Sequence, residues 1–204
     1  MSYQEDLQKF IDEVSFRIVT PDDPDYPYAR SISNSRFHHR PTVIAYCESP
    51  TDVGACLRFS KTASMPFRIR SGGHHHEGMS SGNGVMIIDL SAIGRNAATN
   101  KTHFDYVLNK ETQKPEFVWI PSATKLSVVY SELRDIGMVI PGGGCQSVNV
   151  GGLTQGGGWG VHVRKYGLAC DQMVDAEVVL AGGYVGRASA HKNAEKLLWS
   201  LRGG

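Results

Sequence analysis

Two glycine-rich segments of this 204-residue sequence carry side chains that could do chemistry. The first, RSGGHHHEG over residues 70–78, places His74–His76 between glycines. The second, GGGCQSVNVGG over residues 142–152, contains Cys145, and GGGWG follows at 156–160. Consecutive glycines expose backbone N–H groups with no side chains in the way, and such loops bind phosphate oxygens. Two of these loops therefore predict a large phosphorylated ligand.

The spacing of the glycines fits neither of two familiar nucleotide fingerprints. The sequence contains no GxxxxGK[ST] and no strand-turn-helix GxGxxG with an acidic residue about 20 positions further on, which disfavours a P-loop and a Rossmann nicotinamide site. A metal site is also disfavoured. Neighbouring side chains on an extended backbone point to opposite faces, so at most His74 and His76 could share an ion, and no carboxylate or cysteine pattern completes the ligand set. The residues alone leave open a solvated loop whose imidazoles cap backbone groups.

The pattern around these loops predicts alternating strands and helices. Ser49 or Thr51 is expected to cap a helix, and Gly137 to close another. The strand and helix before the first loop, together with the strand that leads into it, resemble a β-α-β unit. Strands are predicted over residues 40–48, 66–71, 84–91, 104–109, 116–123 and 174–183, and helices over residues 5–14, 49–64 and 124–137.

Composition limits the class of protein. A net charge of +1, 41% hydrophobic and 20% charged residues are typical of a soluble globular chain with a small-molecule ligand, and scattered charges predict neither nucleic-acid nor membrane binding. No apolar run approaches the roughly 18 residues of a membrane span. The amino terminus lacks the features of a signal peptide, so a cytoplasmic location is expected. The four cysteines form no CxxC pair, which argues against zinc and leaves a disulfide open; Cys47, Cys56 and Cys170 are expected to be core thiols.

The two motifs, in order and about seventy residues apart, resemble the flavin-binding half of the vanillyl-alcohol oxidase and para-cresol methylhydroxylase (PCMH) superfamily. The closest similarity is to its berberine-bridge-enzyme-like branch, over about residues 17–204. The branch motif RSGGHxxEG is matched by Arg70, Ser71, Gly72, Gly73, His74, Glu77 and Gly78. The motif GxCxxVxVGG, followed by GGGxG and RxYGL, is matched by Gly143, Cys145, Val148, Val150, Gly151, Gly152, Gly156, Gly157, Gly158, Gly160, Arg164, Tyr166, Gly167 and Leu168.

This resemblance implies an FAD cofactor that is attached covalently twice. His74 would bond to the 8α-methyl carbon of the isoalloxazine and Cys145 to its C6, whereas His75 and His76 occupy variable positions. Val148 would be an oxygen gatekeeper above the flavin, where valine goes with oxidases and leucine with dehydrogenases; the alternative is a strand residue that only packs the domain. The implied cofactor-binding set is Arg70, Ser71, Gly72, Gly73, His74, Gly78, Gly143, Cys145, Val150, Gly151, Gly152, Gly156, Gly157, Gly158 and Val174.

The implied fold is an α+β, PCMH-type FAD-binding domain of two α/β subdomains. We expect an N-terminal helix and lead-in over residues 1–36 and this domain over residues 37–204, truncated before the substrate domain that supplies the general base. The implied function is an FAD-dependent oxidase that abstracts hydride from an alcohol, hemiacetal or amine-adjacent carbon and passes electrons to O2. Its substrate would be a small molecule, bulky sugars, alkaloids or polyketide-like compounds included. Two alternatives stay open: a non-catalytic flavin-binding remnant, and a dehydrogenase with only the histidyl link.

Overall fold

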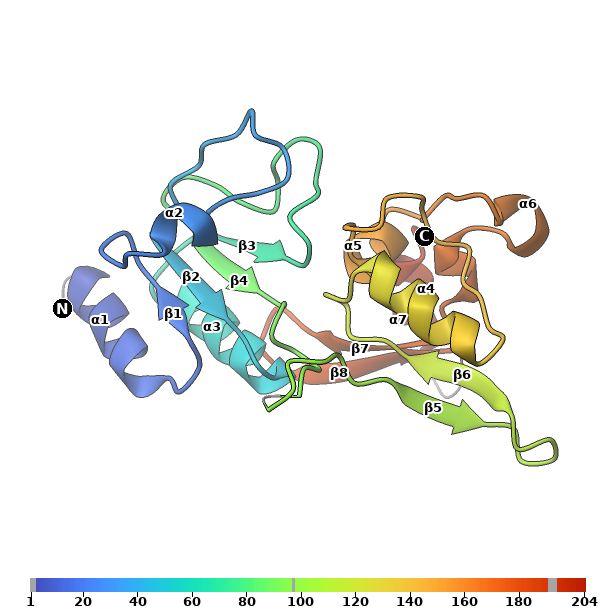
Figure 1. Cartoon of the computed structure of the whole chain (residues 1–204). Helices are drawn as coiled ribbons and strands as arrows, with labels where there is room; N and C mark the ends of the chain where they lie inside the picture. Colours follow the sequence, from blue (N-terminus) through green and yellow to red (C-terminus); the bar gives the residue numbers. More distant parts are fainter. Residues whose placement is uncertain (1–2, 97, 191–193) are drawn as a thin grey trace. The chain divides into compact units, whose positions relative to one another are not determined.

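The computed structural model describes residues 3–96, 98–190 and 194–204 and contains two compact units (Figure 1). Unit 1 comprises Met1–Ala92 and Glu177–Gly186, and unit 2 comprises Ile93–Ala176 and Arg187–Gly204. Both units contain helices and strands, which confirms the expected α/β subdomains. Within the described ranges, no helix is long and apolar enough to cross a membrane.

Unit 1 is built around a four-stranded sheet in the order β1-β2-β4-β3. β1 pairs with β2 in antiparallel orientation, whereas β2 and β3 both run parallel to β4. The predicted β-α-β arrangement is present, but β4 lies between its two strands, so the glycine-histidine loop carries the chain from the edge strand to the middle of the sheet. The elements are α1 (Tyr3–Glu13), β1 (Ile18–Val19), α2 (Tyr26–Ala29), β2 (Val43–Tyr46), α3 (Pro50–Thr62), β3 (Phe67–Arg70) and β4 (Met86–Asp89).

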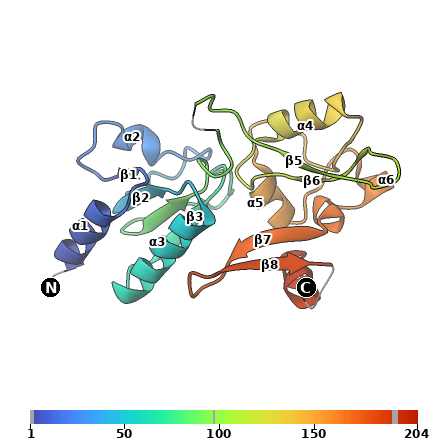
Figure 2. The same cartoon turned by 90° about the horizontal axis from the view of Figure 1, so that it is seen from below.

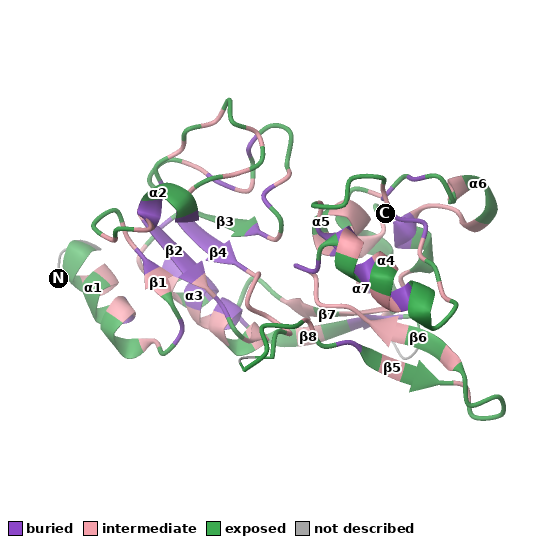
Figure 3. Cartoon of the chain, viewed as in Figure 1, coloured by how far each residue is buried: buried purple, intermediate pink, exposed green. Residues whose placement is uncertain are grey.

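The core of unit 1 lies along the two central strands, β2 and β4 (Figure 3). A continuous apolar run is expected for parallel strands that are covered on both faces. The edge strand β3 differs, because its Phe67 and Ile69 are exposed. The central strands therefore form the rigid part of this unit, and their fully buried side chains are Val43, Ile44, Ala45, Met86, Ile87 and Ile88.

α3 begins at one of the two N-caps that the sequence predicts. The Ser49 hydroxyl accepts a hydrogen bond from the Asp52 N–H, and the Asp52 carboxylate accepts one from the Ser49 N–H. This capping box satisfies two backbone donors at the start of the helix. α1 lies beside α3 (Figures 1 and 2), where Phe10 stacks on Phe59 with ring centroids 4.4 Å apart.

Unit 2 combines an antiparallel hairpin with one longer helix and several short ones. α4 ends just before Gly137, whose positive φ of 72° terminates the helix as predicted. A buried cluster forms where α4 meets α5, and it consists of Phe104, Leu126, Val129, Leu133 and Val150. The elements are β5 (Asp105–Leu108), β6 (Pro115–Trp119), α4 (Leu126–Asp135), α5 (Val150–Gln155), α6 (Val163–Tyr166), the 3-10 helix η1 (Ala169–Gln172) and α7 (Glu195–Leu201).

A final pair of strands, β7 (Asp175–Val179) and β8 (Val185–Ser189), forms a two-stranded sheet. The sequence predicts β7 but misses β8, and it predicts no helix at α2, α5, α6, η1 or α7. These helices have only four to seven residues. A helix of that length is not stable alone, so contacts within the folded unit decide whether it forms.

Candidate functional site

The first candidate segment is the loop that leaves β3 in unit 1. Gly73 and Gly78 are buried and have positive φ values of 68° and 66°, conformations that side chains other than glycine rarely adopt. A Cβ at Gly78 would lie 2.8 Å from the Phe37 ring. Gly72, in contrast, is exposed. Gly73 and Gly78 are thus required by the conformation of the loop itself, whereas the backbone at Gly72 is accessible to a ligand.

The three consecutive histidines have different surroundings. His75 is exposed, and its Nδ1 accepts a hydrogen bond from the Glu77 N–H at 3.2 Å. His76 is also exposed, and its carbonyl accepts one from the Asn34 amide at 2.7 Å. His74 is half-buried, and within the described part of the chain its ring has no hydrogen-bond partner. His75 therefore caps the backbone, while the His74 ring is available for attachment.

Buried polar atoms lie close to both motifs in the sequence. The hydroxyls of Ser80 and Ser81 and the Oδ1 of Asn149 are buried, and among the described residues they have no hydrogen-bond partner. Buried polar atoms are normally hydrogen-bonded, so these three atoms can each bind a polar group of a ligand or a water molecule. The unpaired buried atoms beside the first motif and within the second therefore fit a polar cofactor.

Cys145, in unit 2, differs from the other cysteines. It is exposed, whereas Cys47, Cys56 and Cys170 are buried, as the sequence predicts for core thiols. The Cys145 sulfur lies 3.4 Å from the Ser147 hydroxyl. Hydrogen bonds from that hydroxyl and from the Ser147 N–H hold the pKa of Cys145 below its usual value. The thiolate is the nucleophilic form of cysteine, so exposure and a lowered pKa both favour Cys145 as the nucleophilic thiol among the four cysteines.

The valines that follow Cys145 pack against the core of unit 2. Val150 is 9% exposed within the buried cluster, and its N–H donates to the Thr124 carbonyl. Val148 is half-buried against the same cluster, and its carbonyl accepts a hydrogen bond from the Leu126 N–H at 2.8 Å. Packing thus fixes the backbone of Val148, and part of its side chain remains outside the core. Val174 is also half-buried, and its carbonyl accepts a bond from Ala190.

The glycines of the second motif fall into packed and open positions. A Cβ at Gly151 would lie 2.7 Å from Ser122, and one at Gly158 would lie 2.5 Å from the Ala169 Cβ. A Cβ at Gly152 would meet nothing within 4 Å. Close packing therefore requires the first two, whereas Gly152 offers open backbone. The remaining predicted glycines are Gly143, whose carbonyl is hydrogen-bonded, Gly156 at the end of α5, and Gly157 with a φ of 92°.

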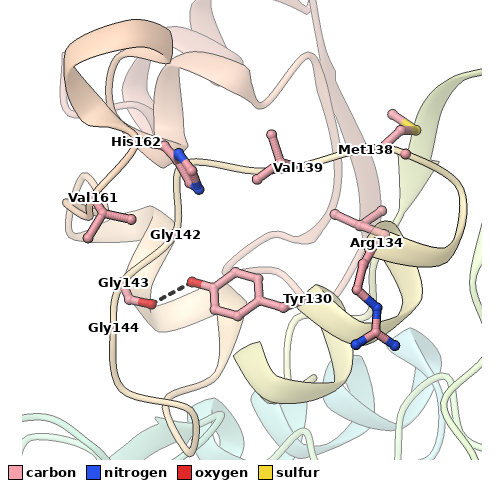
Figure 4. Close-up of a pocket in the computed structure, with 11 residues that line it drawn as sticks. Tyr130, Arg134, Met138, Val139, Gly142, Gly143, Gly144, Val161 and His162 are labelled. Atoms are coloured by element: carbon pink, nitrogen blue, oxygen red, sulfur yellow. Dashed lines mark hydrogen bonds between the residues drawn. The ribbon is translucent and has the colours of Figure 1, made fainter.

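A cavity of about 530 Å³ lies beside the segment that precedes Cys145 (Figure 4). Tyr130 of α4 donates a hydrogen bond to the Gly143 carbonyl at its edge, and burial raises the pKa of this tyrosine. Met138 and Val161 contribute apolar walls. The sequence places Tyr130 only within the helix predicted over residues 124–137, because the cavity arises where α4 meets a loop. The periodicity of apolar residues in the sequence therefore does not predict this cavity.

The geometry of both motifs can be compared with known proteins. A family model for the FAD binding domain matches residues 41–189. The chain belongs to this family. FAD is therefore the phosphorylated ligand that the glycine loops predict. The predicted division into a lead-in over residues 1–36 and a domain over residues 37–204 stays a prediction.

Relatives and solved structures agree with this assignment. YgaK of Bacillus subtilis, an FAD-linked oxidoreductase by name, is 32% identical over 191 residues, which are 92% of this chain and 40% of that protein. Berberine bridge enzyme-like 18 of Arabidopsis thaliana is 32% identical over 201 residues, with 94% and 35% covered. The structure of 6-hydroxy-D-nicotine oxidase from Arthrobacter nicotinovorans is 26% identical, with a TM-score of 0.81 and coverage of 94% and 39%.

These comparisons confirm the resemblance to berberine-bridge-enzyme-like flavoproteins and the PCMH-type FAD-binding fold. The chain spans 35% to 40% of the length of these three proteins. His74 belongs to unit 1 and Cys145 to unit 2. The assignment of FAD thus covers both motifs, one in each unit.

Proposed function

We propose that this chain is the FAD-binding part of an oxidase whose flavin is attached covalently to His74 and Cys145. The full-length protein abstracts a hydride from an alcohol, hemiacetal or amine-adjacent carbon and passes the electrons to O2. Its substrate is a small molecule, bulky sugars, alkaloids or polyketide-like compounds included. A relative named as an FAD-linked oxidoreductase and a structural neighbour named as an oxidase support this proposal.

The observation that carries the proposal is the state of the Cys145 thiol. It is exposed, and its pKa is lowered chiefly by the Ser147 hydroxyl, which favours the nucleophilic thiolate at neutral pH. Cys47 has the opposite character, because its hydrogen bond with Cys56 and its burial raise its pKa. Of the cysteines in the chain, Cys145 is thus the one suited to forming a thioether. Each of the two attachments would replace a C–H bond of the flavin, with loss of a proton and of two electrons that O2 would accept.

The first motif and the two serines after it would hold a different part of the cofactor from Cys145. The exposed backbone at Gly72 suits a phosphate group, since successive N–H groups bind anions. The His74 ring supplies a nitrogen for attachment, and the unpaired Ser80 and Ser81 hydroxyls can bind polar atoms of the ligand. When bound, FAD supplies the hydride acceptor. A covalent tether keeps the flavin in place, so the substrate pocket can stay open to bulky molecules.

The choice of an oxidase over a dehydrogenase depends on Val148. A valine at this position accompanies fast reaction with O2 in the branch that the motifs resemble. The backbone of Val148 is held by Leu126, and its side chain is only half-buried. A larger side chain there would occupy volume that a small diatomic molecule must enter, because protein interiors leave few spare voids.

Intact-chain mass spectrometry after acid precipitation tests the attachment. The full-length protein should carry the mass of one FAD and keep its yellow colour in the denatured pellet. His74→Ala and Cys145→Ala should each retain a single link, and the double variant should release FAD. The matched control is Cys170→Ser, which changes a buried cysteine and should leave both links intact.

The other outcomes separate the alternatives. An unmodified chain with free FAD in the supernatant would contradict covalent attachment. A link at His74 alone would favour the dehydrogenase with a single histidyl link. Bound flavin that no alcohol, hemiacetal or amine reduces would favour the non-catalytic remnant.

A further inference from the structure

Arg70 is the last residue of β3, directly before the loop that carries His74, and its guanidinium is enclosed by protein. Its Nε donates to the Asp89 carboxylate at 2.5 Å, and its Nη1 donates to the Ala29 carbonyl at 2.7 Å. Its Nη2 lies 3.5 Å from the Tyr46 hydroxyl oxygen. Arg70 is 5% exposed and Asp89 is 3% exposed.

These contacts join the ends of three strands and one helix. In the sheet register, Asp89 of β4 stands opposite both Tyr46 of β2 and Arg70 of β3. Ala29 adds the last residue of α2. The Arg70 carbonyl also accepts a hydrogen bond from the Leu90 N–H at 2.9 Å. Side chain and backbone together therefore fix the end of β3.

We propose that Arg70 is a positioning residue that fixes the end of β3 so that the loop presents His74 for flavin attachment. Arg70 does not itself bind the cofactor. Every guanidinium nitrogen already has a protein partner, and only 6% of the side chain is exposed. This inference rests on the proposed attachment at His74, and it differs from the resemblance, which placed Arg70 in the cofactor-binding set.

The loop has a second anchor three residues after Arg70. The Gly73 carbonyl accepts a hydrogen bond from the Ser33 N–H at 3.0 Å, and Gly73 lies against Ile32. His74 follows immediately, so the backbone that leads to it spans two fixed points. Without the side-chain contacts of Arg70, the end of β3 would keep only the backbone bond from Leu90, and the direction of the His74 ring would become variable.

The test compares Arg70→Lys with the matched control Arg68→Lys in the full-length protein. Arg68 lies on the same strand but is exposed, and its Nη1 donates a hydrogen bond to the adjacent Phe67 carbonyl at 3.1 Å. A lysine at position 70 keeps a positive charge near Asp89. It has a single nitrogen, however, and cannot bind the partners of three guanidinium nitrogens at once.

Two backgrounds separate positioning from cofactor binding. In Cys145→Ala protein, the rate of flavin attachment to His74 is followed by peptide mass spectrometry after FAD is added to the flavin-free chain. Arg70→Lys should slow attachment by about tenfold or more, because a misdirected reacting group loses the benefit of orientation, while Arg68→Lys should change it by less than about twofold. In the double variant His74→Ala with Cys145→Ala, where no link forms, Arg70→Lys should leave the amount of FAD retained by the folded chain unchanged.

An equal loss of His74 attachment and FAD retention in Arg70→Lys would overturn the inference, because it would indicate direct contact or general unfolding. An unchanged attachment rate would also overturn it. Absence of flavin on His74 when Arg70 is present would instead overturn the proposed function, and this inference with it. Should Arg70→Lys unfold at the assay temperature, Tyr46→Phe removes one guanidinium partner and should give the same split between attachment and retention.

Discussion

Ser147 places its hydroxyl 3.4 Å from the Cys145 sulfur, so removal of this hydroxyl should slow the chemistry of that sulfur. Its hydroxyl is the largest cause of the lowered pKa of Cys145. In Ser147→Ala the pKa should rise toward its usual value, leaving less thiolate at neutral pH, and iodoacetamide should alkylate the flavin-free chain several-fold more slowly. The two rates should converge at a pH well above the usual pKa range of cysteine, where both thiols are ionised.

The buried cysteines provide the control for this comparison. Cys47, Cys56 and Cys170 should stay unlabelled in the native chain and react only after denaturation. Peptide mass spectrometry distinguishes the four sites. If Cys145 were alkylated at the same rate with and without the Ser147 hydroxyl at neutral pH, the prediction that Ser147 lowers the pKa of Cys145 would be wrong.

Val148 is the residue at which we expect one added methylene to change the reaction with oxygen. Val148→Leu should slow reoxidation of the reduced flavin strongly, because the added group fills volume beside the half-buried valine, while substrate reduces the flavin at nearly the same rate. Stopped-flow measurement in air-saturated buffer checks both steps.

The Val148→Ala variant serves as the control, since it enlarges the same space and should keep reoxidation fast. Overpacking against the nearby cluster costs about 1–3 kcal/mol, so thermal unfolding of each variant is measured alongside. Equal reoxidation rates for valine and leucine would contradict the gatekeeper role. Slow reoxidation of the unmodified protein would point to a dehydrogenase with another electron acceptor.

At this scale, sequence motifs point to the residues proposed for flavin attachment, but not to the residues that surround them. His74 and Cys145 are recognisable because each stands at a set distance from glycines. The burial of Arg70 cannot be recognised in this way, because its ionic partner Asp89 lies 19 residues further along the chain. A charged residue is rarely buried unless it is paired, and only the strand register reveals the pair.

At the scale of elements, two adjacent glycines of α5 should respond oppositely to alanine. A Cβ at Gly151 would lie 2.7 Å from the backbone oxygen of Ser122, whereas one at Gly152 meets nothing within 4 Å. Gly151→Ala should therefore destabilise the flavin-free chain by about 1–3 kcal/mol. Gly152→Ala should stabilise it by about 0.5–1 kcal/mol, because alanine loses less entropy in a helix. Urea unfolding measures both changes.

The same Gly152→Ala variant should retain less FAD, because the new methyl group occupies the open space where the cofactor is expected to approach the backbone. Gain of stability with loss of cofactor would identify Gly152 as a functional glycine. A variant that is more stable and binds FAD normally would remove Gly152 from the cofactor-binding set.

Elements with strong periodicity are predictable from sequence, and their order in the sheet is less so. α3 and α4 have clear apolar faces and end signals, and both are found where expected. The position of β4 between β2 and β3 depends on a long loop that no periodic pattern describes. The sequence does contain one signal: β4 is continuously apolar until Asp89, as expected for a parallel strand covered on both faces, whereas β3 alternates apolar and charged residues.

At the scale of the whole molecule, unit 2 exposes several large apolar side chains, among them Trp159 and Val161, which are 72% and 85% exposed. They lie two residues apart in a chain that spans 35% to 40% of the length of the three proteins compared above. Scattered single apolar residues are normal on a protein surface, whereas contiguous ones mark surfaces that become covered. We therefore expect the 204-residue chain, expressed alone, to bind hydrophobic dye, to aggregate and to incorporate flavin weakly.

A double variant, Trp159→Ser with Val161→Ser, tests whether these two side chains cause that behaviour. Dye fluorescence and light scattering of the isolated chain should both fall, because the variant removes adjacent apolar area without touching the buried core. Tyr28→Ser is the matched control, since Tyr28 is 85% exposed on unit 1 and should change neither signal. In the full-length protein, the double variant should leave solubility unchanged if other parts of that protein cover this surface. Equal dye binding by the double variant and the unmodified chain would show that other residues form the dye-binding apolar surface. A soluble, fully flavinylated 204-residue chain would contradict the expectation that these apolar side chains must be covered.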